Sequence, residues 1–504
     1  MKRTAAALLA AVLAASAAAC GGETAAPSGD APAVETASVQ DTEAAGAETE
    51  AEYVPDGLPS GLDLGGGTVT FLYRSEVSEE FFADSANGEI VNDAVYKSVL
   101  DTEERLNVDI NAVTRPGHTT DVRQEYMNHI KNSILSGDSL YDWVDLMIGN
   151  SPVMMSDGIF LDLAKNSYID LSRPWYLKDM ADTVSIDGQL YFIAGDISLG
   201  YMRCAFGMYF NKQIAEDYGI ESLYALVDGG AWTLDSLMRV SAQASEDING
   251  DGKYDIGDKL GFVNHDNNHP KGFWASTDIK LYERDESGEW KFGFGTERTA
   301  GVCDKLYNLF FTNPGSYFSG VTNAVPEQQE HYNQVSAKYA SGEIFIITAE
   351  LDDSVAQLRD MKDPYGILPY PKYDESQAAY YSSSRNTHNA FSMPVTCSDP
   401  ERAGAVMEAL SCAKYNYVLP TYFEVALKSK YARDDDSSRM YDIIRDSMIL
   451  DFGYTYGNAI GSPEGVFSDS YKKEGSLISN VAKKQKSLEK ALEKYLEKVR
   501  NNCG

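Results

Sequence analysis

The alternation of short apolar strands with amphipathic helices is the feature that most limits what this chain can fold into. After the glycine break that begins at Gly65, residues 68–73 are β-branched and aromatic, which is typical of a strand. Apolar residues then recur at helical spacing before the next strand begins. This order favours a parallel α/β sheet with crossover helices. The pattern predicts strands at 68–73, 108–113, 144–148, 191–194 and 344–348, and helices at 92–107, 126–135 and 480–500.

Length and charge limit the class of protein further. The chain has 504 residues, enough for two domains with a core in each. Its formal net charge is −33. Because phosphate binding needs clustered Lys and Arg, a chain this acidic is not expected to bind nucleic acid. A strongly negative surface also favours a soluble monomer.

The N-terminus resembles a bacterial export and lipidation signal. Lys2 and Arg3 precede an apolar run at 5–15, which is too short to span a bilayer stably and is typical of a signal peptide. Small residues then precede Cys20, as in a lipobox, although Ala17 stands where a Leu is usual. We therefore expect residues 1–20 to be a lipoprotein signal peptide and lipobox. Lipidation of Cys20 would anchor the protein on the extracellular face of the membrane; the alternative is an ordinary signal peptide with a chance cysteine.

Residues 21–63 form a low-complexity segment. Acidic residues recur in it, basic ones are absent, and large apolar residues are almost lacking. Such a segment cannot offset the entropy cost of ordering, so we expect a disordered tether that lifts a folded domain off the membrane.

The five cysteines that follow Cys20 carry little functional signal. None forms a CxxC pair, which argues against a metal cluster. An odd number leaves at least one thiol outside any intramolecular disulfide. Buried free thiols are the simplest interpretation for several of them.

One twelve-residue segment indicates a metal site by itself. DINGDGKYDIGD, at 247–258, reads D-x-N-x-D-G-x-x-D-x-x-D. Calcium prefers six to eight oxygen ligands, which a loop with a sharp glycine turn supplies. Asp replaces the final Glu of an EF-hand, so the loop resembles the dockerin-type variant. The alternative is a polar surface turn. The predicted ligands of a structural Ca²⁺ are Asp247, Asn249, Asp251, the Lys253 carbonyl, Asp255 and Asp258.

Several stretches, taken in order, resemble extracellular solute-binding proteins of family 1, the maltose-binding-protein-like type, and especially lipoproteins of Gram-positive bacteria. The resemblance covers about residues 66–500, and it rests on the order of the stretches because no one motif is diagnostic. The stretches are GDSLYDWVDLMIGN, FLDLAKNSYIDLSRPWY, GQLYFIAGDISLGY, MYFNKQIAEDYGIESLYALVDGGAWTLDSL, YGILPYPKYDESQAAYYS and YFEVALKSKYARDDDSSRMYDIIRDSMILDFGY.

This resemblance implies a two-lobed, periplasmic-binding-protein-like α/β fold of class II. Each lobe would be a mixed sheet flanked by helices, with a ligand cleft between the lobes that closes by a hinge motion. The expected function is capture of a carbohydrate, most simply an oligosaccharide, for the permease of an ABC importer. We expect lobe one at 64–195 and 385–425, and lobe two at 196–384 and 426–504.

Candidate ligand-binding residues follow from the chemistry of sugars. Pyranose rings present apolar faces and a rim of hydroxyls, so aromatic platforms and hydrogen-bonding side chains are expected. Strand ends and the segments that cross between lobes are the expected places for the polar groups. For each residue the alternative is an ordinary core, cap or loop position. The candidates are Asn150, Trp175, Tyr176, Asp196, Trp274, Glu350, Asp352, Tyr381 and Arg385.

Enzyme motifs were sought as the competing interpretation. The chain has no GxSxG, HExxH, P-loop or strand-following GxGxxG. His265 and His269 are four apart in a predicted polar loop, where a chance pair is the simpler interpretation. A carboxylate pair for glycoside hydrolysis stays open. The expectation is therefore a binding protein without enzyme activity; the alternatives are a lipid-anchored carbohydrate-active enzyme or a surface sensor or adhesion lipoprotein with the same fold.

Overall fold

The computed structural model describes residues 53–322, 325–353, 358, 361–423 and 434–503. The described residues belong to a compact unit that begins at Tyr53. The predicted signal peptide and lipobox at 1–20, and the part of the predicted tether before Tyr53, lie outside the described residues. The end of that tether differs from prediction. The Val54 amide donates to Asn416 Oδ1 at 2.9 Å, so the chain already packs on helix α13 (Pro400–Thr421) before residue 64.

The first sheet has four strands in the order β11-β3-β1-β2. The β1 strand pairs in parallel with both β2 and β3, whereas β11 runs antiparallel to β3. Every residue of β3, WVDLM, is buried, because helices cover both faces of the sheet. The sheet is mixed, as predicted. The strands are β1 (Gly67–Arg74), β2 (Val108–Arg115), β3 (Trp143–Met147) and β11 (Asn389–Ser392).

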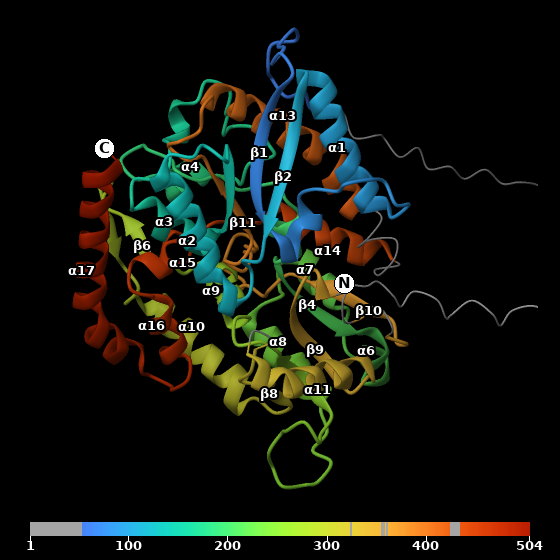
Figure 1. The fold of residues 1–504 in the computed structure, drawn as a ribbon. Helices are drawn as coiled ribbons and strands as arrows, with labels where there is room; N and C mark the ends of the chain where they lie inside the picture. Colours follow the sequence, from blue (N-terminus) through green and yellow to red (C-terminus); the bar gives the residue numbers. More distant parts are fainter. Residues whose placement is uncertain (1–52, 323–324, 354–357, 359–360, 424–433, 504) are drawn as a thin grey trace, which may run out of the picture. The chain divides into compact units, whose positions relative to one another are not determined.

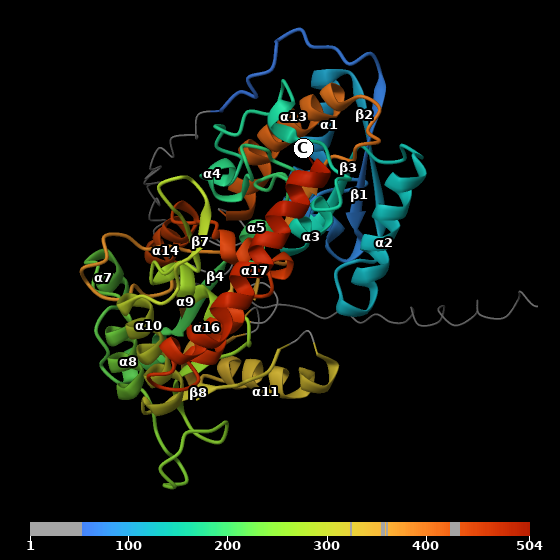
Figure 2. The same ribbon diagram turned by 90° about the vertical axis from the view of Figure 1, so that its left-hand side faces the viewer.

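Helices pack on opposite faces of this sheet. The α1 helix (Ile90–Leu106) lies beside α13 on one face, and α2 (Thr120–Ser136) lies on the other (Figures 1 and 2). The α1 helix ends at Asn107, which has a φ of 50° and caps the helix in the left-handed conformation. Across the sheet, the Trp143 ring nitrogen donates to the Ala403 carbonyl at 3.0 Å and the Tyr126 hydroxyl donates to the Asp145 carbonyl at 2.9 Å. These bonds fix both helices to the strand that leads to the site.

The second sheet has five strands in the order β10-β4-β9-β5-β8. Its β5 strand is parallel to β8 and β9, while β4 is antiparallel to β9 and β10, so this sheet is mixed as well. A separate two-stranded hairpin consists of β6 and β7. The strands are β4 (Phe206–Asn211), β5 (Leu260–Asn264), β6 (Tyr282–Arg284), β7 (Trp290–Phe292), β8 (Ser316–Phe318), β9 (Ile344–Glu350) and β10 (Tyr365–Leu368).

Local sequence signals account for several of the remaining helices. Thr233 caps α8, because the Ser236 amide donates to its hydroxyl and the Thr233 amide donates to Ser236 Oγ. The other helices are α3 (Ser151–Met155), α4 (Met180–Val184), α5 (Gly200–Arg203), α6 (Lys212–Asp217), α7 (Leu223–Asp228), α8 (Leu234–Gln243), α9 (Pro270–Ser276), α10 (Glu297–Tyr307), α11 (Gln329–Ala340), α14 (Asp435–Asp446), α15 (Phe452–Thr455), α16 (Glu464–Ser470) and α17 (Leu477–Cys503).

The predicted strand at 191–194 is wrong. The segment makes one isolated antiparallel bridge, in which Ile193 and Phe391 exchange hydrogen bonds of 2.9 and 2.8 Å. Its backbone then turns away at Gly195, whose φ is 152°. The apolar residues are buried as in a strand, but the ladder does not extend beyond a single pair.

Three short segments pass side by side between the two sheets. The Phe206 amide donates to the Ser383 carbonyl and the Arg385 amide donates to the Cys204 carbonyl, both at 2.9 Å. On the other side, the Ser382 amide donates to Ser447 O at 2.9 Å. Backbone hydrogen bonds therefore join three segments, which we name the crossing segments: 204–206, 382–385 and 447–449. Such short backbone connections are where a hinge between two sheets would bend.

The C-terminal helix α17 contacts elements that follow the first sheet's helices as well as elements beside that sheet. It packs on α10, α16 and β7. Near its end, the Tyr495 hydroxyl donates to the Pro152 carbonyl at 2.7 Å, beside the first sheet. The predicted helix at 480–500 is confirmed, with Leu488, Leu492 and Val499 on its buried face. The predicted lobe limits stay a prediction, and α17 is a segment that touches both sides.

Candidate functional site

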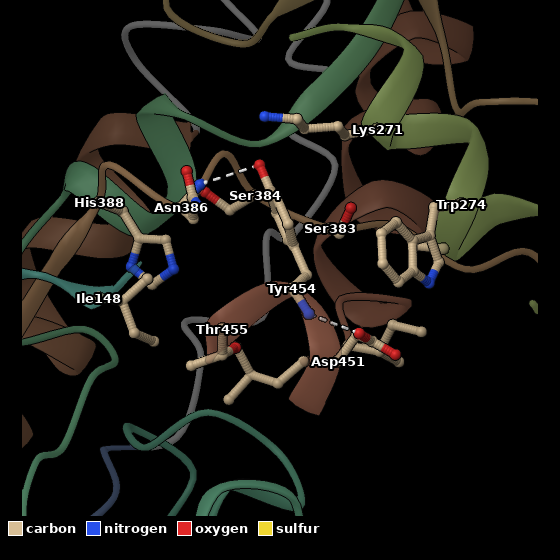
Figure 3. Close-up of a pocket in the computed structure, with 13 residues that line it drawn as sticks. Ile148, Lys271, Trp274, Ser383, Ser384, Asn386, His388, Asp451, Tyr454 and Thr455 are labelled. Atoms are coloured by element: carbon tan, nitrogen blue, oxygen red, sulfur yellow. Dashed lines mark hydrogen bonds between the residues drawn. The ribbon is translucent and has the colours of Figure 1, made fainter. Parts of the chain in front are cut away.

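A pocket lies where the crossing segments meet α9 and α15 (Figure 3). Its free volume is about 20 Å³, which accommodates roughly one water molecule. Residues from both sides of the crossing segments contribute to it. The lining residues are Ile148, Lys271, Trp274, Ala275, Ser383, Ser384, Asn386, His388, Ile449, Leu450, Asp451, Tyr454 and Thr455.

Backbone hydrogen bonds hold the pocket walls in place. The Ile148 amide, at the end of β3, donates to the His388 carbonyl at 2.8 Å, and the next amide, that of Gly149, donates to the Asn386 carbonyl at 3.1 Å. The Asn386 amide in turn donates to the Tyr454 hydroxyl at 3.2 Å (Figure 3). The end of β3, the residues directly after the second crossing segment and α15 therefore form one hydrogen-bonded frame.

Two aromatic rings form the apolar wall of the pocket. The ring centroids of Trp274 and Tyr454 are 6.0 Å apart, with planes at 42°. Trp274 also packs on Phe294 and Phe467, which fix its orientation. Trp274 is 2% exposed and Tyr454 8% exposed. A ligand can therefore contact these rings only after the pocket has opened. An aromatic wall beside polar groups suits the apolar face of a sugar ring.

Polar groups complete the lining. Burial lowers the pKa of His388 to about 3, so its ring is neutral near pH 7 and can both donate and accept a hydrogen bond. Burial raises the pKa of Asp451 to about 7, although its carboxylate accepts the Tyr454 amide at 2.8 Å. The two Ser residues and Asn386 add neutral donors and acceptors. Such a mixture fits hydroxyl groups.

Two arginines, Arg385 on a crossing segment and Arg203 at the end of α5, bind carboxylates at the end of β9. Arg385 Nη1 lies 3.1 Å from Glu350 Oε1, and burial raises the pKa of that carboxyl group. Arg203 donates two hydrogen bonds to the Asp352 carboxylate, from Nε to Oδ1 and from Nη2 to Oδ2, both at 2.9 Å. Its Nη1 also lies 3.2 Å from Oε1 of Glu80, which follows β1. Glu350, Asp352 and Arg385, three of the predicted site residues, thus join the crossing segments to the second sheet.

Other predicted residues lie elsewhere. Trp175 is fully buried against Tyr176 and Tyr415, and the Tyr176 hydroxyl donates to Glu408 Oε2 of α13 at 2.6 Å. Neither ring lines the pocket, and Trp175 offers no exposed face to a ligand. Both rings point away from the pocket lining because they pack in the interior between their own segment and α13.

The remaining three predicted residues are polar and lie outside the pocket lining. Asn150 is buried, and its Oδ1 accepts from Asn458 Nδ2 at 3.1 Å. The Asp196 amide donates to the Trp175 carbonyl, and burial raises the pKa of the Asp196 carboxyl group to about 8. Tyr381 is half-buried, directly before the second crossing segment. Of the nine predicted residues, Trp274 alone lines the pocket.

Sequence reasoning missed Lys271, Asn386 and Tyr454. Lys271 lies three residues before Trp274, one turn earlier on the same helix, and Asn386 follows Arg385 directly. Proximity to predicted residues was the only signal for these two. Tyr454 lies between Phe452 and Tyr456, and nothing in the sequence separates it from these buried neighbours.

The histidine pair at 265 and 269 is buried, not in a polar surface turn. The His265 amide donates to Thr348 Oγ1 at 3.0 Å, and His269 Nδ1 lies 2.9 Å from the same oxygen. Burial lowers the pKa of His265 to about 4 and that of His269 to about 3. The pair therefore supports the end of β9 in the neutral state.

The loop at 247–258 folds around its own acidic side chains. Asp247 Oδ2 accepts the Gly252 amide and Asp251 Oδ1 accepts the Lys253 amide, both at 2.8 Å. Gly252 has a φ of 79°, a conformation that favours glycine. Asp258 is buried and closes the loop by accepting the amides of Ile248 and Asp255, both at 2.9 Å. Within the described part of the chain, no group of three or more His, Cys, Asp or Glu side chains is arranged to hold a metal ion.

Among the helices of the described residues, none combines the length and the apolarity that a membrane span requires.

Comparisons with known proteins point to one fold. A cyclic α-maltosyl-1,6-maltose binding protein from Arthrobacter globiformis matches with a TM-score of 0.55 at 13% identity, over 85% of this chain and 100% of that chain. The galacto-N-biose-/lacto-N-biose I-binding protein of the ABC transporter from Bifidobacterium longum matches with a TM-score of 0.54 at 12% identity, over 86% and 98%. A cyclo/maltodextrin-binding protein solved with maltotetraose gives 0.52 at 11%, over 89% and 98%.

At these identities the matches define the fold alone. No family model matches the chain, and no curated protein matches it. The chain has the two-lobed α/β fold of periplasmic binding proteins, with a mixed sheet flanked by helices in each lobe, as predicted. The solved proteins that share it are described as sugar-binding proteins, one of them belonging to an ABC transporter.

Proposed function

We propose that this chain is the extracellular substrate-binding component of an ABC importer, and that it captures an oligosaccharide between its two lobes. The observation that carries the proposal is the fold it shares with three sugar-binding proteins over 85–89% of its length. The pocket at the crossing segments, with the Trp274 and Tyr454 rings beside polar groups, suits a pyranose.

Binding requires the pocket to open. Sites for small molecules have volumes of about 300–1,000 Å³, far above the roughly 20 Å³ between these side chains. The crossing segments connect the two sheets through a few backbone hydrogen bonds, and rotation about them would separate α9 from the end of β3. We propose that the lobes open to admit the ligand and close over it, and that the closed form is the one that the permease recognises.

We further propose that the protein is a monomeric lipoprotein on the extracellular face of the cell membrane. Support comes from the sequence before Cys20 and from the acidic segment that follows it. Its partners would be the sugar, the membrane through lipid at Cys20, and the permease subunits. We propose a binding protein and not an enzyme, in line with the three solved proteins of this fold, each described as a binding protein.

We also propose that the loop at 247–258 binds a structural Ca²⁺. The donor set of carboxylates, an amide and a backbone carbonyl consists of the hard oxygen ligands that calcium prefers. The turn at Gly252 and the amides bound by Asp247 and Asp251 support this proposal, because they bend the loop around its acidic side chains. Lys253 would contribute its carbonyl, and Asn249, Asp255 and Asp258 the remaining oxygens. When bound, the ion would fix the loop and add stability.

Thermal unfolding against a panel of mono- and oligosaccharides tests the proposed function. A ligand that binds only the folded state stabilises it by about 2.7 kcal/mol at a hundredfold excess over Kd. We expect one class of sugar to raise the Tm while the others leave it unchanged. A Tm that no sugar moves, in a preparation that unfolds cooperatively, would contradict the proposal.

A further inference from the structure

The beginning of α17 lies on the second-sheet side, meaning the second sheet and the helices packed on it. The helix packs on α16 and α10, and α10 contacts α8, which lies on β5. Just before α17, the Gly475 amide donates to Asp304 Oδ1 of α10 at 2.8 Å. Leu477 and Val481, in the first two turns, are buried. Burial of apolar surface therefore stabilises this end of the helix.

The last turns of α17 reach the first-sheet side, meaning the first sheet and the segments packed on it (Figures 1 and 2). The Asn502 side chain donates to the Ser156 carbonyl, and the Tyr191 hydroxyl donates to the Cys503 carbonyl, both at 2.9 Å. Gly158, with a φ of 70°, allows this close approach, because a Cβ there would lie 2.4 Å from the Asn502 carbonyl oxygen. The contact at this end is therefore close and largely polar.

Two basic side chains add ion pairs at the same end of α17. Lys498 Nζ lies 2.6 Å from Asp157 Oδ1. Arg500 Nε lies 2.7 Å from Asp187 Oδ2, and its Nη2 lies 3.2 Å from Glu289 Oε1. Asp187 follows α4, whereas Glu289 lies in the turn between β6 and β7. Arg500 thus joins α17, the segment after α4 and the β6–β7 hairpin.

The hairpin reaches the end of α4 through a second arginine. Arg284 Nη2 donates to the carbonyls of Asp182 and Ser185 at 3.2 and 3.1 Å. Phe294, two residues after β7, packs on Trp274 of α9 with ring centroids 6.0 Å apart. Because α9 follows β5, the hairpin belongs with the second-sheet side. The α4 segment is therefore held from that side by both the hairpin and α17.

Two connections of different kinds thus join the two sides. The crossing segments are covalent and bend, whereas the contacts of Lys498, Arg500 and Arg284 involve none of these segments and can break. A rotation that opens the pocket must either release these contacts or pull α17 away from α10 and α16. Single hydrogen bonds and exposed ion pairs are weak, whereas the beginning of α17 is held by apolar burial. The C-terminal end of the helix is therefore the end that releases.

We infer that residues 495–503, which we name the clasp, hold the pocket closed and leave the first-sheet side before a sugar enters or departs. The inference rests on the proposed function, because it gives the proposed motion of the lobes a specific release step. The clasp would set how often the pocket opens, and so the rates at which a sugar binds and dissociates.

Small-angle X-ray scattering and thiol labelling of the mature chain, residues 21–504, test the inference without any sugar. The test variant carries Lys498→Met and Arg500→Met, which remove both cations of the clasp. We expect a larger radius of gyration than in the wild type, because the two sides separate more often. We also expect iodoacetamide to modify Cys503 at least tenfold faster. Its thiol donates to the Met155 carbonyl at 3.1 Å and becomes exposed when the clasp is released.

Matched controls separate the clasp from net charge and from unfolding. Lys490→Met with Lys494→Met removes the same two charges from exposed positions of the same helix, and should behave like the wild type. The buried Cys303 should be modified equally slowly in every variant, which shows that the fold is intact. Tyr495→Phe removes the hydrogen bond to α3 without a change of charge, and should act in the same direction as the test variant. It decides the question if the test variant unfolds.

Two results overturn the inference. If the test variant keeps the wild-type radius of gyration, the clasp does not hold the pocket closed, even where Cys503 is modified faster. If the control variant expands as much as the test variant, net charge and not the clasp sets the opening. Neither result touches the proposed function, which fails separately if no sugar stabilises the wild-type protein.

Discussion

Trp274 of α9 and Tyr454 of α15 pack against each other with ring centroids 6.0 Å apart; α9 follows β5 of the second sheet, whereas α15 contacts α4 and residues 148–150 at the end of β3. The Tyr454 hydroxyl accepts the amide of Asn386, the residue that directly follows the second crossing segment. Motion of α9 relative to α15 must separate these rings. The aromatic wall is therefore coupled to the opening of the pocket.

Replacing Trp274 should weaken ligand binding more than it weakens the fold. We expect Trp274→Phe to lower sugar affinity about tenfold, because the smaller ring covers less of the sugar face. Trp232→Phe is the control: it makes a buried ring smaller and removes the 2.8 Å bond to the Pro369 carbonyl, away from the pocket lining. Calorimetry and thermal unfolding of both variants separate the effects. Equal loss of affinity in the two variants would contradict a contact role for Trp274.

Asp196 should make stability depend on pH. Burial raises its pKa to about 8, above the value of about 3.9 in an unfolded chain. The folded state therefore binds more protons between these values, and the contribution of Asp196 to stability is lost as the pH rises through 8. Asn mimics the protonated acid, so Asp196→Asn should match the wild type near pH 3.5 and exceed its stability increasingly as the pH rises to 8.5. Urea unfolding across this range measures the difference.

The exposed Asp109 provides the control for this pH effect. Asp109→Asn should follow the wild-type curve at every pH, since its environment is water in both states. A parallel course for Asp196→Asn as well would show that the Asp196 carboxyl group is ionised in the folded protein.

Calcium should stabilise the loop at 247–258. Removal of the ion with EDTA is expected to lower the Tm by a few degrees, and added Ca²⁺ to restore it. Asp247→Ala should abolish this response. Asp374 is the control, because its carboxylate accepts the amides of Ser376 and Gln377 in a similar turn elsewhere. Asp374→Ala should keep the response to EDTA and Ca²⁺. A Tm indifferent to EDTA, in protein shown beforehand to contain calcium, would refute the site.

Lipidation at Cys20 is tested by fractionation. In the native host, the wild-type protein should sediment with membranes and take up a labelled fatty acid, whereas Cys20→Ser should do neither. Cys204→Ser serves as the control, since Cys204 lies in the folded unit. Unlabelled wild-type protein would point to an ordinary signal peptide.

The sequence predicted the parts of the fold that local patterns determine. β1, β2, β3 and β9 are runs of β-branched and apolar residues, and α1, α2 and α17 carry apolar stripes, so spacing alone locates them. The segment at 191–194 has the same composition but forms one bridge, because pairing depends on a neighbour, Phe391, far along the chain. Composition carries no information about such a partner.

The site was predictable only in part for the same reason. Trp175 and Trp274 are both flanked by aromatic or small residues, and nothing local shows that the first faces α13 and the second a pocket. The pocket brings together Ile148, Lys271, Asn386 and Tyr454 from four separate segments. Their convergence is a property of the crossing segments, which are too short to leave a periodic pattern.

Native mass spectrometry of the mature chain mixed with a panel of oligosaccharides shows directly whether the protein captures a carbohydrate. We expect a complex of one chain with one intact oligosaccharide, and recovery of that sugar unchanged after release. Absence of any sugar complex, or recovery of a cleaved product, would contradict capture of a carbohydrate by a binding protein.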